Sequence, residues 1–133
     1  MDIVDETLRE WRSGVFVYGQ SDCMLSIGRY LARTGHDDVT GQFLGRYDTH
    51  EGAAAEIKAH GGIAGLMALA GAVAKDAHPA RGDVVEVVYS GEQETCGIGG
   101  LCTGDGVALR LDRGTIEVAL RFITYRGVWH GSR

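Results

Sequence analysis

The stretch that joins a short apolar run to the second helical pattern of the chain reads Phe16-Val17-Tyr18-Gly19-Gln20-Ser21-Asp22-Cys23-Met24-Leu25. Asp22 is placed to cap the helix through its carboxylate, and Cys23 would lie in the first turn. Unpaired backbone N–H groups and the positive end of the helix dipole favour a thiolate at that place. A carboxylate beside the sulfur opposes the thiolate, so Asp22 is interpreted chiefly as the helix cap.

Cys23 has two interpretations. A thiolate attacks carbonyl carbon, so the position suits the nucleophile of a hydrolase. Free cysteine is also among the most buried residue types, so the position equally suits a small core residue on a packed helix. The residues alone leave both interpretations open.

The rest of the chain predicts helices first and strands afterwards. Apolar spacing, polar caps and glycine stops predict helices over 3–13, 23–34, 50–60 and 63–70, with a polar loop over 36–47. Alternating patterns predict strands over 84–89, 95–102, 107–111, 115–120 and 123–129. This order predicts one domain spanning 1–133 with an α+β fold, in which N-terminal helices pack on one side of a small curved antiparallel sheet.

Composition restricts the function classes. The chain has 133 residues, a net charge of −5 and no basic cluster, so we expect no nucleic-acid partner. Three cysteines and an acidic start without an apolar leader argue against a secreted disulfide scaffold. No apolar run approaches the length of a membrane span, so we expect none, and we expect synthesis in the bacterial cytoplasm.

Several motifs resemble those of the NlpC-like cell-wall cysteine peptidases, which have a papain-like fold. That family shows an aromatic-x-x-Gly turn and then Asp-Cys opening a helix, as in Phe16 to Cys23 here. It shows Gly-Asp before an apolar strand, which resembles Gly82-Asp83-Val84-Val85, and later a His-x-Gly-Ile strand, where this chain has Cys96-Gly97-Ile98.

More narrowly, the chain resembles a branch of that superfamily encoded in tailed phages, prophages and phage-like gene transfer particles. The matching segments occur in the same order: Trp11-Arg12, Gly19 to Cys23, Gly45-Arg46-Tyr47 and Gly61-Gly62. Such genes lie among tail genes. The resemblance therefore implies a tail-tip or tail-assembly component, with other tail proteins and possibly peptidoglycan as partners.

The resemblance implies Cys23 as nucleophile, but the sequence departs from the family pattern at the base. The family histidine falls at Thr95, which takes no proton at neutral pH, and the residue that orients it falls near Ala108. Five histidines remain as other candidates, and a solvated surface residue is the simpler interpretation of each: His36, His50, His60, His78 and His130.

No cofactor and no metal are expected. Cys96 and Cys102 could join Cys23 and a histidine around a metal, but their spacing matches no usual Cys-x-x-Cys knuckle, and packing in the sheet explains them more simply. The glycines from 97 to 104 are followed by no helix, so they form no phosphate loop.

Two functions follow from the sequence. One is a tail-tip or tail-assembly structural component, built on an NlpC-like scaffold whose catalytic site has decayed and located in the virion or particle tail. The other is an active peptidase or amidase that cleaves peptidoglycan stem peptides during cell entry. The threonine at position 95 favours the first function.

Overall fold

The computed structural model describes residues 1–88 and 97–132. Within these residues, helices α1 (Ile3–Ser13), α2 (Cys23–Arg33), α3 (His50–Ala59) and α4 (Gly62–Leu69) come first. Five strands follow: β1 (Val84–Val88), β2 (Gly97–Cys102), β3 (Gly106–Leu111), β4 (Gly114–Ala119) and β5 (Thr124–Trp129). Short 3-10 turns are η1 (Thr40–Gln42) and η2 (Leu120–Phe122). The predicted α+β class and its order are confirmed.

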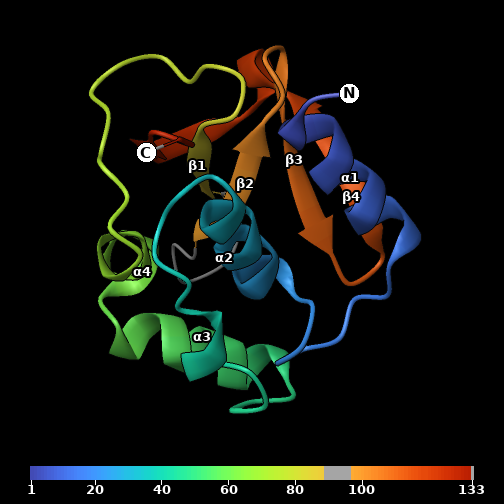
Figure 1. The fold of residues 1–133 in the computed structure, drawn as a ribbon, viewed down its shortest axis with the longest axis vertical. Coiled ribbons are helices and arrows are strands. Elements are labelled where there is room, and N and C mark those ends of the chain that lie inside the picture. Colours follow the sequence, from blue (N-terminus) through green and yellow to red (C-terminus); the bar gives the residue numbers. More distant parts are fainter. Residues whose placement is uncertain (89–96, 133) are drawn as a thin grey trace.

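The strands form one antiparallel sheet in the order β4-β3-β2-β1-β5. Figure 1 shows α1 and α2 in front of this sheet, with α4 to the left of α2 and α3 below it. α1 contacts β4, α2 contacts β2 and β3, and α4 contacts β2. The prediction that the helices pack on one side of the sheet is therefore confirmed.

The core between the helices and the sheet forms from apolar residues that recur at helical spacing. Val4, Leu8 and Trp11 recur on one stripe of α1 and are buried against α2 and the strands. The same cluster includes Trp129 at the end of β5, so both ends of the described chain contribute to one core.

The second face of the sheet carries its own apolar cluster, made by Val85, Val87, Cys102, Val107 and Leu109. β4 and β5 are the two opposite edges of the sheet, so the η2 connection must pass from one edge to the other. Leu120 and Ile123 of this connection pack against the cluster. The crossing segment thus helps to cover the face that has no helices.

Helix boundaries follow the predicted caps. Asp2, Asp22 and Thr49 each accept a hydrogen bond from a backbone N–H of the first turn that they precede. A cap of this kind stabilises a helix by about 1 kcal/mol. Gly35, with φ +95°, follows the last turn of α2 and ends it in the left-handed region, where a residue without Cβ fits best.

Segment 36–47 differs from the predicted polar loop. It contains η1, and four of its residues are buried: His36, Thr40, Phe43 and Tyr47. Gly28 on α2 explains part of this, because a Cβ there would approach Thr40 Cγ2 to 2.8 Å, so only glycine lets the segment pack this closely. The predicted solvated role of His36 is wrong, since its Nδ1 lies 3.2 Å from the Leu31 carbonyl oxygen at the end of α2.

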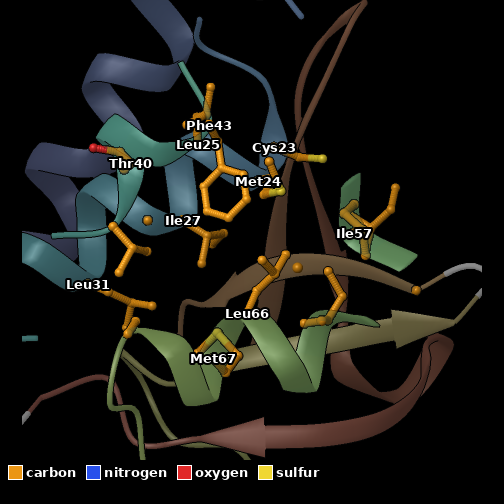
Figure 2. Close-up of a pocket in the computed structure, with 17 residues that line it drawn as sticks. Cys23, Met24, Leu25, Ile27, Leu31, Thr40, Phe43, Ile57, Leu66 and Met67 are labelled. Atoms are coloured by element: carbon orange, nitrogen blue, oxygen red, sulfur yellow. The ribbon is translucent and has the colours of Figure 1, made fainter. Parts of the chain in front are cut away.

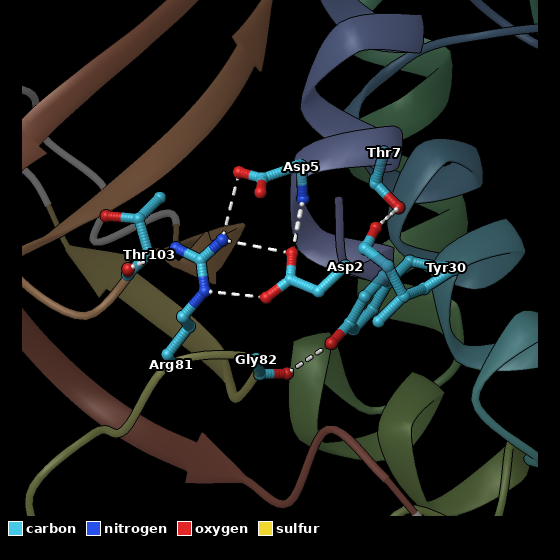
Figure 3. A network of polar contacts seen from close by, with 8 residues as sticks. Asp2, Asp5, Thr7, Tyr30, Arg81, Gly82 and Thr103 are labelled. Carbon is cyan, nitrogen blue, oxygen red and sulfur yellow. Dashed lines mark hydrogen bonds and ion pairs between the residues drawn. The ribbon is translucent and has the colours of Figure 1, made fainter.

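Arg81 connects the start of α1 to the strands (Figure 3). Its guanidinium donates to both Asp2 carboxylate oxygens at 3.0 Å, to Asp5 at 3.0 Å and to the Thr103 carbonyl at 2.7 Å. The bidentate contact matches the planar fork of arginine. It lowers the pKa of the Asp2 carboxyl from 3.8 to about 2.

Replacing Arg81 with glutamine should return the pKa of Asp2 most of the way from about 2 to 3.8. A lowered pKa favours the folded state above the ordinary pKa, and this contribution disappears as the pH falls through about 2. Carboxyl chemical shifts followed by NMR across acid pH measure the change. An Asp2 pKa that is the same in both proteins would contradict the assigned contact.

Candidate functional site

Cys23 is the first residue of α2, as predicted, and Asp22 is its N-cap. The Asp22 side chain is 1% exposed and its two oxygens accept three hydrogen bonds. Oδ1 accepts from the Leu25 N–H at 3.0 Å, while Oδ2 accepts from the Gly19 N–H at 2.8 Å and the Tyr47 hydroxyl at 2.6 Å. Asp22 therefore joins the glycine turn, the start of α2 and the end of the η1 segment.

Two of the motifs quoted from the sequence meet at this carboxylate. The Gly45 N–H donates to the Gly19 carbonyl at 2.9 Å, beside the bond from Tyr47 to Asp22. Gly19 has φ +81°, and a Cβ there would collide with the Tyr47 carbonyl oxygen. The Gly-x-x-Asp-Cys turn and the Gly-Arg-Tyr segment thus form one packed unit, and packing accounts for Gly19, Asp22 and Tyr47 in it.

The electrostatics of Cys23 oppose a thiolate. Burial of the thiol, followed by the neighbouring Asp22 carboxylate, raises the pKa of Cys23 from 9.0 to about 12. Hydrogen bonds from the backbone N–H groups of Met24 and Cys23 itself act in the opposite direction but are outweighed. The backbone N–H groups at the start of α2 therefore stabilise the thiolate, as predicted, but burial and Asp22 outweigh them. The thiol of Cys23 is neutral at physiological pH.

No histidine takes part in a hydrogen bond or ring contact with Cys23 within residues 1–88 and 97–132. His36 and His60 bond to carbonyls at the ends of α2 and α3. The ring of His50 lies 6.2 Å from that of Tyr18, and His78 lies near Tyr125. His130 is exposed, as are His50 and His78, in agreement with their predicted surface positions.

An apolar cavity of about 50 Å³ lies beside Cys23, between α2, η1, α4 and the first half of β2 (Figure 2). Its walls include the side chains of Cys23, Met24, Phe43, Leu66 and Met67. Gly97 and Gly99 of β2 line it without side chains. A wall of this composition offers no charged group to a polar substrate.

The positions where the family places its base and orienting residue lie toward β2 and β3. Thr95 falls in segment 89–96, outside the described residues, as does Cys96. Ala108 is fully buried in the helix-facing core opposite Leu101 and contributes no polar atom.

The Gly82-Asp83 motif also has a packing role. The Asp83 carboxylate accepts from Lys75 Nζ at 2.6 Å and the Ala80 N–H at 2.9 Å, and it receives the Gly131 N–H at 3.4 Å. Asp83 is 6% exposed. Asp83 therefore connects the segment that precedes β1 with Gly131, which follows β5. Within the described part of the chain it makes no hydrogen bond to Cys23.

The metal alternative does not fit the described cysteines. Cys23 lies at the helix-facing cavity, whereas Cys102 belongs to the cluster on the second face of the sheet. Within the described residues, no group of three or more histidine, cysteine or acidic side chains is arranged to hold a metal ion. None of the helices in that part of the chain is long and apolar enough to span a membrane.

Two buried polar groups were missed by the sequence analysis. Tyr47 was placed at the end of a polar loop, but it is buried and its hydroxyl completes the Asp22 site. Glu86 is 5% exposed, and its carboxylate pairs with Arg126 at 2.7 Å on the helix-facing side of the sheet. A glutamate inside the run Val84-Val85-Glu86-Val87-Val88 was the available signal, because an unpaired charge is rarely buried in a strand.

Comparison with known proteins gives one match. The model of the family described as "Domain of unknown function (DUF6950)" matches residues 2–130. No curated protein and no solved structure matches the chain.

Proposed function

We propose that this chain, which belongs to the DUF6950 family, is a structural component of the tail tip of a phage or phage-like particle. In this proposal it keeps the scaffold of an NlpC-like peptidase, with papain-like layering, but performs no hydrolysis. It would be made in the bacterial cytoplasm and incorporated into the tail, where its partners are other tail proteins.

The surroundings of the Cys23 thiol support the proposed loss of catalysis. A cysteine hydrolase needs a thiolate or a base beside the thiol. Here the pKa of the Cys23 thiol is raised to about 12, and no imidazole contacts it within the described residues. The motif residues around the thiol have packing roles instead, because Asp22 binds Gly19, Leu25 and Tyr47.

The assignment to a tail has a different support, namely the order of the segments that resemble the phage branch. The fold is consistent with it, since a helix opening with Asp22-Cys23 packs on an antiparallel sheet.

The alternative remains a peptidase or amidase acting on stem peptides. Its specific support is the location of Cys23 at the start of α2, with two backbone N–H groups beside the sulfur that suit an oxyanion hole. In that case a residue other than Thr95 would have to accept the proton from the Cys23 thiol.

Purified peptidoglycan separates the two functions. We expect the wild-type chain and its Cys23→Ala variant to release the same background amount of new amino termini, while an active NlpC-like enzyme in a parallel sample releases many more. The measurement is amine labelling of soluble fragments followed by mass spectrometry. Release that depends on Cys23 would overturn the structural proposal and establish the hydrolase.

The tail location needs its own test. An antibody against the chain should label one end of the tail in negatively stained particles from the producing bacterium. Labelling absent from purified particles, with the protein found only in the cell lysate, would contradict a virion component even if no hydrolysis is detected.

A further inference from the structure

The outer edge of β4 is an unpaired strand edge. β4 ends the sheet and pairs only with β3 in the part of the chain that the structure describes. Leu111 and Gly114 pair across the two-residue turn between these strands, so the backbone groups of Thr115 and Glu117 point away from β3. Neither residue makes a backbone hydrogen bond to another part of the described chain. Such an edge offers its N–H and C=O groups to a strand of another molecule.

The side chains along this edge specify what fits it. Ile116 is 45% exposed, and Arg113 and Glu117 on either side of it are exposed charges of opposite sign. Neither charge belongs to any of the ion pairs within residues 1–88 and 97–132. Edge strands of soluble proteins are commonly protected by lysine or proline, and β4 contains neither.

We propose that two copies of this chain pair β4 against β4, antiparallel and about a two-fold axis, so that their sheets become one continuous sheet. The surface is complementary to itself, because Thr115 then faces Thr115 of the second copy. In that register Arg113, in the turn just before β4, comes beside Glu117 of the other copy, and two ion pairs form.

Charge favours this register over the two that follow it. A pairing centred on Ile116 would place Glu117 opposite Thr115 and Arg113 opposite Ala119, so no ion pair would form. A pairing centred on Glu117 would place the two glutamates opposite each other and Arg113 opposite Arg121, and like charges in directly opposite positions destabilise a strand pair. In the register centred on Thr115, Ile116 instead faces Gly114 of the second copy, and the two isoleucines become diagonal neighbours on one face.

A single pair of short strands buries less surface than a standard interface, so the association should be reversible. Sedimentation velocity of the full chain at low ionic strength, over micromolar to near-millimolar concentrations, should show a monomer that converts to a dimer. Arg113→Glu and Glu117→Arg should each weaken the dimer roughly threefold to thirtyfold, because each places like charges opposite one another twice. The double variant should restore the wild-type dissociation constant to within about threefold, because the two pairs re-form with reversed signs.

Two variants on α3 match these changes in charge. Lys58→Glu and Glu51→Arg alter exposed residues that the proposed interface does not include, and both should dimerise as the wild type does. Thermal unfolding by circular dichroism shows that each variant is folded. A monomer at every concentration, assembly beyond a dimer, or single reversals that behave like the α3 controls would each overturn the pairing. The inference is independent of the proposed tail function, and its failure would leave the peptidoglycan and labelling tests unchanged.

Discussion

Iodoacetamide should alkylate Cys23 of the folded protein about 30- to 60-fold more slowly than a model thiol near neutral pH, because the loss of thiolate is partly offset by the greater nucleophilicity of a thiolate with a higher pKa. The reason is the population of thiolate, which is the attacking form. Raising the pKa from 9.0 to about 12 lowers that population by three powers of ten at any pH well below 9. The start of a helix alone would have produced the opposite result, since it stabilises negative sulfur.

Mass spectrometry of the Cys23 peptide after timed alkylation measures the rate. The same peptide from protein unfolded in urea supplies the reference, because the unfolded thiol regains an ordinary pKa and full access. If folded Cys23 reacts as fast as the unfolded thiol, the result would contradict the raised pKa. It would then favour the alternative function, a peptidase or amidase with Cys23 as nucleophile.

The same pKa has a consequence for stability at alkaline pH. Above about pH 9 the unfolded chain releases the thiol proton, whereas the folded chain holds it up to about pH 12. The unfolded state then binds fewer protons, so the free energy of unfolding falls as the pH rises through this interval. In Cys23→Ala this part of the fall disappears.

Local features of the fold could be predicted from the sequence because they depend on neighbouring residues. Asp22 caps α2 through the N–H of Leu25, three positions away, and Thr49 caps α3 through Gly52 in the same manner. The β-branched run from Val84 onward likewise predicts a strand over 84–89, and β1 begins at Val84 and extends to Val88, the last described residue before 97. Gly28 lowers the helix propensity of α2, which indicates a close neighbour, and Thr40 is the residue that packs against it.

Contacts between distant segments could not be predicted in this way. Nothing near Tyr47 indicates that its hydroxyl meets a carboxylate 25 positions earlier, and the polar appearance of segment 36–47 favoured a solvated loop. The net pKa of Cys23 also depends on distant segments and could not be predicted from neighbouring residues. The sequence shows the helix start and Asp22, but the burial that dominates comes from the packing around α2.

Replacing Asp22 with alanine should lower the free energy of unfolding by about 3–7 kcal/mol. Loss of the cap on α2 accounts for about 1 kcal/mol, and the buried donors of Gly19 and Tyr47 lose their acceptor, at about 1–3 kcal/mol each. Burial makes the loss severe, since Asp22 is 1% exposed and Tyr47 is 8% exposed, so water does not readily replace the carboxylate. Urea unfolding followed by circular dichroism gives the free energy.

Two variants separate the cap from the long-range contacts. Thr49→Ala removes only a cap, whose bond to the Gly52 N–H is 3.0 Å long, and should cost about 1 kcal/mol. Tyr47→Phe keeps the ring and removes one bond to a charged acceptor, so it should cost about 1.5–3 kcal/mol. If Asp22→Ala costs no more than Thr49→Ala, then Asp22 is a simple cap, and the packed unit of Gly19, Asp22 and Tyr47 does not stabilise the fold. A loss several times larger, shared in part by Tyr47→Phe, would instead give this turn a structural role that does not depend on any chemistry at Cys23.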